Sequence, residues 1–265
     1  MTVTCYPSPG KKKGLMLCEA FAQGCGGQVA ALGDPVLRDG AGFFYGWTDY
    51  TAPLIARCKA EGRTWFYCDN AYYLGRHTWF RVTKNAMMHD GSGQHGLERL
   101  KPFGVELKPW NLTGRNIVIT SQSEVHYTAR LGTTRDAWTA AVIAELRCHT
   151  DRPIKVCHKP DAKSSGNAYA APGFEAELAD AWVVVAHCSS AMVKALIDGV
   201  PVFSLASSMA TRMGRSDLAQ IEDPHYPNDR MQWLANLAAN QWTRDEMRDG
   251  TCWRALQTQT MEIAA

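Results

Sequence analysis

The sequence contains no long apolar run, although 46% of its 265 residues are hydrophobic. No stretch of 18 residues is apolar throughout, so we expect no transmembrane helix. Lys11, Lys12 and Lys13 lie too close to the start, with too little apolar sequence after them, to begin a secretory leader. These absences predict a cytoplasmic protein without a membrane span.

The nine cysteines form no recognisable pattern. None belongs to a C-x-x-C pair and their number is odd, which argues against a disulfide framework and favours reduced thiols. Three pairs of neighbours combine cysteine with histidine: Cys148-His149, Cys157-His158 and His187-Cys188. Because adjacent residues of a strand point to opposite faces, we expect no metal site from these pairs.

Two catalytic signatures are also absent. The chain has no G-x-x-x-x-G-K-[ST] motif, which excludes a P-loop kinase, and no G-x-S-x-G motif, which argues against a nucleophile-elbow hydrolase. The net charge is only +2, so no global field attracts polyanions. Residues 1–125 nevertheless hold 14 basic and 10 acidic residues, so a small positive excess lies in the first half.

The most informative stretch runs from Asp180 to Ala206. Its β-branched run at 182–186 suits a buried parallel strand, and Ser189-Ser190 can cap a helix over 191–197. Gly199 then ends that helix before a second apolar strand at 200–203. Strand, turn, helix and strand form one βαβ unit, whose helix N-terminus offers free N–H groups to an anion.

Residues 189–202, SSAMVKALIDGVPV, resemble the donor-site motif of GT-B-fold glycosyltransferases, in which a Ser/Thr turn and a helix precede Gly-x-Pro-Val. The resemblance implies that Ser189 and Ser190 hold the diphosphate of a nucleotide sugar, with His187 beside them. Lys194 stands where many retaining members carry a ribose-binding Glu, so it meets a phosphate instead or faces solvent. The strand at 154–158 matches one that ends near the donor phosphates, which implies donor contacts for His158 and Lys159. An ordinary Rossmann-like unit without sugar chemistry is the alternative.

The rest of the chain alternates strands and helices, which predicts an α/β fold. Strands are expected at 14–21, 41–47, 63–68, 79–82, 115–120, 154–158, 182–186 and 200–203, and helices at 51–61, 134–149, 174–178, 191–197, 231–241 and 243–250. The GT-B resemblance implies two Rossmann-like domains that face a cleft, with C-terminal helices crossing back. We place an acceptor-side domain at 1–114 and a nucleotide-sugar-binding domain at 115–265.

Asp69 is the predicted catalytic base of the first domain. It directly follows the strand predicted at 63–68, and open α/β sheets bind ligands at the carboxyl ends of their strands. A turn cap is the alternative role for this carboxylate, and Asp49 and Glu19 are rival bases. The residues predicted to contact the acceptor are glycines near the first strand and aromatic or basic residues further on: Gly26, Gly27, Tyr72, His77, Arg81 and Lys84.

The resemblance implies a glycosyltransferase that moves a sugar from a nucleotide-sugar donor to a hydroxyl group, without an essential metal or other cofactor. Small bacteriophage transferases that glycosylate hydroxymethylated bases suggest DNA as the acceptor, and the basic, aromatic first half is compatible with it. A glycan or polysaccharide bound by Trp and Tyr rings fits equally well. The alternative from another class is a nucleotide-binding module without catalysis.

Overall fold

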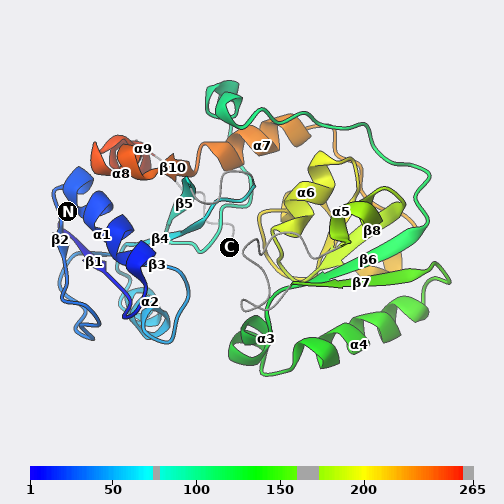
Figure 1. The fold of residues 1–265 in the computed structure, drawn as a ribbon, viewed down its shortest axis with the longest axis horizontal. Helices are drawn as coiled ribbons and strands as arrows, with labels where there is room; N and C mark the ends of the chain where they lie inside the picture. Colours follow the sequence, from blue (N-terminus) through cyan, green and yellow to red (C-terminus); the bar gives the residue numbers. More distant parts are fainter. Residues whose placement is uncertain (74–77, 160–172, 259–265) are drawn as a thin grey trace. The chain divides into compact units, whose positions relative to one another are not determined.

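The computed structural model describes residues 1–73, 78–159 and 173–258 and divides the chain into two compact units. Unit 1 contains residues 1–89 and 237–265, and unit 2 contains residues 90–236. Each unit is built around a sheet with helices packed against it (Figure 1). The mixed α/β class predicted from the sequence is therefore confirmed.

The sheet of unit 1 has the strand order β10-β5-β4-β3-β1-β2. Its parallel part comprises β1 (Val3–Tyr6), β2 (Gln28–Val29), β3 (Ala41–Tyr45) and β4 (Trp65–Asn70). The strands β5 (Trp79–Lys84) and β10 (Gln241–Thr243) continue the sheet in antiparallel fashion. The helices α1 (Lys12–Cys25) and α2 (Thr51–Ala60) connect successive parallel strands.

Both faces of this sheet are buried, because successive strand residues point to opposite sides. Phe43 and Phe66 pack with Phe21 of α1 on one face. Their neighbours Phe44 and Tyr67 join the core that includes α2 on the other face. A parallel sheet covered on both sides needs strands that are apolar at every position, as β3 and the start of β4 are.

The prediction of a strand at residues 14–21 is wrong, because these residues lie in α1. Leu17, Cys18 and Phe21 are buried and recur at helical spacing, so they form the apolar face of a helix. The first strand is instead β1, a four-residue strand that precedes the helix. Gly26 consequently ends a helix rather than a strand, and Glu19 is an exposed helical residue.

Unit 2 contains a parallel sheet of β6 (Asn116–Ser121), β7 (Ile154–His158), β8 (Ala181–Ala186) and β9 (Val202–Ser204) in the order β7-β6-β8-β9. The helices α4 (Arg135–Arg147), α5 (Phe174–Leu178) and α6 (Ala191–Ile197) lie where the sequence predicts them. Thr134 caps α4 by accepting a hydrogen bond from the Ala137 amide at 3.1 Å. A further helix, α3 (Glu124–Leu131), follows β6 and was not predicted.

The remaining elements lead the chain out of unit 2 and back to unit 1. Short 3-10 turns occur at Leu97–Arg99, Lys101–Phe103, Thr211–Met213 and Leu218–Gln220. Helix α7 (Arg230–Ala238) spans the boundary between the units, and α8 (Arg244–Arg248) and α9 (Thr251–Thr258) then pack on α1. The capping box predicted at Thr243 and Glu246 is confirmed.

The compact units divide the chain at other positions than the predicted boundary at Gly114. Unit 2 already begins at Asp90, and the C-terminal helices belong to unit 1 by their packing. The missing side chain of Gly24 allows α8 to approach α1 closely, because a Cβ at this position would overlap the carbonyl oxygen of Met247. Sequence order alone does not reveal such a return, because it depends on contacts between segments more than 200 residues apart.

Candidate active site

The strand order of unit 2 creates a topological switch point between β6 and β8. Along the chain, β6 comes first, β7 pairs on one side of it, and β8 pairs on its other side. Connections that leave two adjacent strands in opposite directions open a crevice at the carboxyl ends of these strands, where open α/β sheets bind ligands. The residues that follow β6 and β8 are therefore the first candidates for a binding site.

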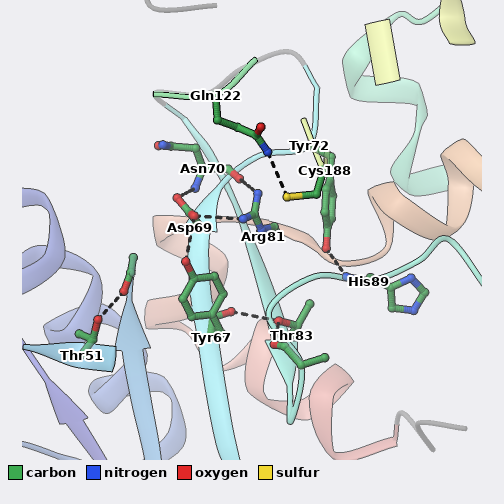
Figure 2. A network of polar contacts seen from close by, with 12 residues as sticks. Thr51, Tyr67, Asp69, Asn70, Tyr72, Arg81, Thr83, His89, Gln122 and Cys188 are labelled. Carbon is green, nitrogen blue, oxygen red and sulfur yellow. Dashed lines mark hydrogen bonds and ion pairs between the residues drawn. The ribbon is translucent and has the colours of Figure 1, made fainter. Parts of the chain in front are cut away.

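Gln122 follows β6 and Cys188 follows β8, and their side chains meet across the switch point. The Gln122 Nε2 donates a hydrogen bond to the Cys188 Sγ at 3.0 Å (Figure 2). The Tyr127 hydroxyl of α3 donates to the Gln122 Oε1 at 3.2 Å. The amide is thus fixed on both sides, by its bonds to Cys188 and to Tyr127.

Two histidines lie beside this pair. His126 of α3 and His187 after β8 approach to 3.2 Å between Nε2 and Nδ1. Burial lowers the pKa of His126 to about 4, with further lowering by the charges of Arg130, His187 and Lys159. Burial and Arg130 also lower the pKa of His187. Both imidazoles are therefore neutral at pH 7, and Arg130 and Lys159 place positive charge near them.

His158 is the last residue of β7, which pairs with β6, and Lys159 follows it. The Ser121 Oγ lies 2.7 Å from the His158 Nδ1, and the Lys159 amide donates to the Ser121 carbonyl oxygen at 3.1 Å. Burial and Arg135 lower the pKa of His158. The exposed Lys159 side chain extends from the carboxyl edge of the sheet, which is the edge that carries the switch point.

Ser189 and Ser190 form the turn between β8 and α6. The Ser189 Oγ accepts a hydrogen bond from the Ala191 amide at 3.2 Å, whereas the Ser190 side chain makes no capping bond. His158, Lys159, His187 and this turn therefore occupy one edge of one sheet. The structure brings these five predicted donor residues together, and their role in binding a donor stays a prediction.

Lys194 is engaged elsewhere on α6. Its ammonium forms an ion pair with Asp198, at the C-terminal end of the helix, and Asp198 also pairs with Lys108 at 3.1 Å. Ser189 lies at the other end of this helix. In this conformation Lys194 is therefore directed away from the serine turn.

The polar network of unit 1 centres on Asp69, the penultimate residue of β4. Its Oδ2 accepts hydrogen bonds from the Tyr67 hydroxyl at 3.1 Å and from the Arg81 Nη2 at 3.0 Å (Figure 2). Its Oδ1 accepts from the Asn70 amide at 2.7 Å. The Asp69 side chain keeps 27% of its surface exposed, so a fixed carboxylate still faces solvent.

Arg81 connects Asp69 with Tyr72. Its Nη1 donates to the Asn70 carbonyl oxygen at 3.1 Å, and its guanidinium carbon lies 5.2 Å from the centre of the Tyr72 ring. The Tyr72 hydroxyl accepts from the His89 amide at 2.7 Å (Figure 2). Arg81 is directly opposite Asp69 in the register of β4 and β5, so two of the predicted acceptor residues gather around the predicted base.

Three other predicted acceptor residues lie away from Asp69. The antiparallel course of β5 puts Lys84 opposite Phe66, near the start of β4. Gly26 ends α1 with φ of 65°, and a Cβ on Gly27 would lie 2.5 Å from the carbonyl oxygen of Val3, the first residue of β1. These glycines thus lie at the amino edge of the sheet, opposite to Asp69. His77 lies outside the described residues.

Sequence reasoning missed several polar residues of both edges. Unit 1 also has a switch point, between β1 and β3, where the Ser8 Oγ lies 3.3 Å from the Thr48 Oγ1. Recognition of β1 would have drawn attention to Ser8. In unit 2, Gln122 lies two residues after the strand predicted at 115–120, whereas His126 lies in α3, a helix that the sequence did not predict.

The comparisons with known proteins show a fold but no family. No family profile matches the sequence, and no curated protein is detectably similar to it.

Among the described residues, every helix is too short or too polar to cross a membrane.

Two solved structures share the fold over most of both chains. One is described as "Thermosulfurimonas dismutans KpsC, beta Kdo 2,4 transferase", with 10% identity, a TM-score of 0.55, and coverage of 89% of this chain and 90% of that one. The other is described as "Thermosulfurimonas dismutans KpsC, beta Kdo 2,7 transferase", with 12% identity, a TM-score of 0.50, and coverage of 97% and 99%. At this identity the likeness establishes that the chain has the fold of these two transferases.

Proposed function

We propose that this protein is a glycosyltransferase of the GT-B type, which moves a sugar from a nucleotide-sugar donor to a hydroxyl group of an acceptor. The observation that carries the proposal is the carboxyl edge of unit 2, where a serine turn, a histidine and a lysine gather beside a topological switch point. The shared fold supports it, because both similar structures are described as transferases of Kdo, a sugar. The arrangement of two Rossmann-like domains is part of the same proposal.

The phosphates of the donor would bind at the turn formed by Ser189 and Ser190. Hydroxyl and backbone N–H donors at a helix start suit an anion, and the charges of Lys159 and Arg130 add to this attraction. When the sugar leaves, negative charge accumulates on the phosphate. Donors and cations that are already in place stabilise this charge more strongly in the transition state than in the ground state.

Asp69 would act as the base in a transfer that inverts the sugar. A hydroxyl nucleophile has a high pKa, so a carboxylate that accepts its proton as the bond forms accelerates the reaction by roughly 10²–10⁴-fold. The hydrogen bonds from Tyr67, Asn70 and Arg81 fix the orientation of this carboxylate. Its exposed fraction leaves room for an acceptor hydroxyl.

A glycan or polysaccharide is the acceptor class that we favour. Tyr72 and Arg81 are both buried, with 1% and 9% of their surface exposed, so they support the predicted base and offer no face to a sugar ring. The preference depends on the two similar structures, which are both described as transferases of Kdo, a sugar. The hydroxymethylated base in DNA stays a prediction. It depended on a basic cluster with His77, Arg81 and Lys84, of which Lys84 lies near the start of β4, away from Asp69.

The test begins with a thermal-shift screen of nucleotide sugars, since a ligand that binds only the native state raises the melting temperature. The best donor is then incubated with the protein alone and with glycan or DNA acceptors. We expect slow release of the free nucleotide without an acceptor and faster release with a glycan. A donor that binds without any release would identify a nucleotide-binding module, and the absence of a shift with every nucleotide sugar would refute the proposal.

A further inference from the structure

The three side chains of His126, His187 and Cys188 form a compact cluster at the switch point of unit 2. Their potential ligand atoms all lie within 4.8 Å of one another. His126 comes from α3, whereas the other two residues follow β8. The cluster therefore joins two segments that are about 60 residues apart in the sequence.

The distances within this cluster match the edges of a metal tetrahedron. The His126 Nε2 lies 3.2 Å from the His187 Nδ1. The Cys188 Sγ lies 3.4 Å from the His187 Nδ1 and 3.8 Å from the His126 Nε2. Zn²⁺ bonds to nitrogen and sulfur predict edges of about 3.4 Å between two nitrogens and about 3.6 Å between nitrogen and sulfur. One ion can therefore bind all three atoms with only small movements of the side chains.

The objection that adjacent residues point to opposite faces does not apply to His187 and Cys188. Strand β8 ends at Ala186, so both residues lie in a bend in which strand alternation is lost. In contrast, Cys157 and His158 lie within β7 and follow that alternation. The Cys148-His149 pair is exposed and has no such third neighbour among the groups found in the described residues.

We propose that His126, His187 and Cys188 bind a borderline-soft divalent cation, with Zn²⁺ as the preferred ion. A thiolate and two neutral imidazoles are the ligands that Zn²⁺ takes in proteins, whereas Mg²⁺ requires oxygen. Arg130 and Lys159 place positive charge near the cluster, which does not attract a cation. The ion would therefore be held by its bonds to sulfur and nitrogen, and not by negative charge around the site. This inference does not depend on the proposed glycosyl transfer.

Binding requires small changes in protonation. The Cys188 thiol loses its proton to solvent, and each imidazole presents a lone pair at the bonded nitrogen while its proton stays on the other ring nitrogen. Gln122 supports the thiolate, because its Nε2 already donates to the sulfur at 3.0 Å. Three protein ligands leave the fourth position of a tetrahedron to water or to another ligand.

The test uses the full chain, freed of metal by a chelator and kept reduced by a phosphine. Titration with Co²⁺ should give the visible bands of a tetrahedral ion and a thiolate charge-transfer band, and Zn²⁺ should abolish both at one equivalent. Mg²⁺ should have no effect. If wild-type protein shows no thiolate band with Co²⁺, the proposal is wrong, and this result requires no variant.

Variants identify the ligands. Cys188→Ser should remove the charge-transfer band, and His126→Ala or His187→Ala should weaken Zn²⁺ binding by at least about tenfold. The matched control Cys148→Ser changes an exposed cysteine and should keep the full spectrum. Circular dichroism without metal establishes that each variant is folded. Retention of the band in folded Cys188→Ser would overturn the assignment, because another of the nine cysteines would then bind the ion.

Discussion

The two units arrange four parallel strands in the same order but place different chemistry at the switch point. In unit 1 the order is β2-β1-β3-β4, and in unit 2 it is β7-β6-β8-β9. In each unit the first of these strands along the chain has the second strand on one side and the third strand on the other. In unit 1 the Ser8 and Thr48 hydroxyls face each other there, 3.3 Å apart. In unit 2 the corresponding place holds the Gln122 amide and the Cys188 thiol. The topology therefore provides the position, and the side chains decide the function.

The hydroxyls of unit 1 are largely occupied by local bonds. Thr48 lies 3.1 Å from the Thr51 hydroxyl, which donates to the Gly46 carbonyl oxygen at 2.7 Å. The proposed base of this unit is instead Asp69, near the carboxyl end of β4. Strand β3 separates β4 from β1. This contrast motivates the assignment of donor phosphates to unit 2 and of the acceptor base to unit 1.

Replacement of Asp69 should cause the largest loss, and the loss should be in turnover. Asp69→Asn keeps the size and the ability to accept hydrogen bonds, but the amide cannot accept the acceptor proton. If the transfer inverts the sugar, we expect turnover to fall by roughly 10²–10⁴-fold while donor binding to unit 2 is unchanged. Steady-state kinetics and calorimetry measure the two quantities separately.

Asp49→Asn is the matched control for this substitution, because Asp49 is an exposed carboxylate after β3. A structural role for Asp69 would instead lower the melting temperature, since Arg81 would lose its ionic partner. If Asp69→Asn melts like the wild type and keeps its turnover, Asp69 is not the base, and the division of roles between the units loses its acceptor side.

Replacement of Lys159, at the carboxyl edge of the sheet of unit 2, should have an intermediate effect on donor binding. Lys159→Ala should weaken donor binding by about 1–3 kcal/mol, or roughly 5–150-fold in Kd, if its ammonium bonds to a phosphate. Calorimetric titration with the best donor measures this loss. Lys155→Ala is the control, because Lys155 of β7 is also exposed but lies four residues before Lys159. Equal affinities of the two variants would remove Lys159 from the donor site.

Substitutions at the opposite edge of unit 1 should affect stability alone. Gly26→Ala places a Cβ in open space at φ of 65°, which costs about 1 kcal/mol. Gly27→Ala also forces a clash with the Val3 carbonyl, so we expect a loss of about 1–3 kcal/mol. Denaturant unfolding measures both values. A loss of turnover without a loss of stability would restore the predicted contact between these glycines and the acceptor.

The sequence predicted unit 2 better than unit 1, for physical reasons. Its buried parallel strands read as continuous apolar runs, and the cap at Thr134 and the glycine at 199 mark helix ends. In unit 1 the first strand has only four residues, and the short apolar run of α1 suits a strand as well as a helix. The donor edge followed from one local motif, residues 189–202.

The remaining features depend on contacts that are distant in the sequence. The pairing of Asp69 with Arg81 requires the antiparallel turn from β4 to β5, which apolar patterning did not specify. His126 of α3 meets His187, which lies 61 residues later in the sequence. The return of α8 and α9 to unit 1 likewise depends on packing against α1, more than 200 residues earlier.

Binding of nucleoside diphosphates to the serine turn tests the central claim most directly. Calorimetric titration compares the wild type with a double variant, Ser189→Leu and Ser190→Leu, whose fold is checked by circular dichroism. We predict saturable binding to the wild type and at least about tenfold weaker binding to the folded double variant, because bulky apolar side chains block the turn and remove two hydroxyl donors. Equal affinity in both proteins, or no binding to the wild type, would contradict the assignment of the donor site to unit 2.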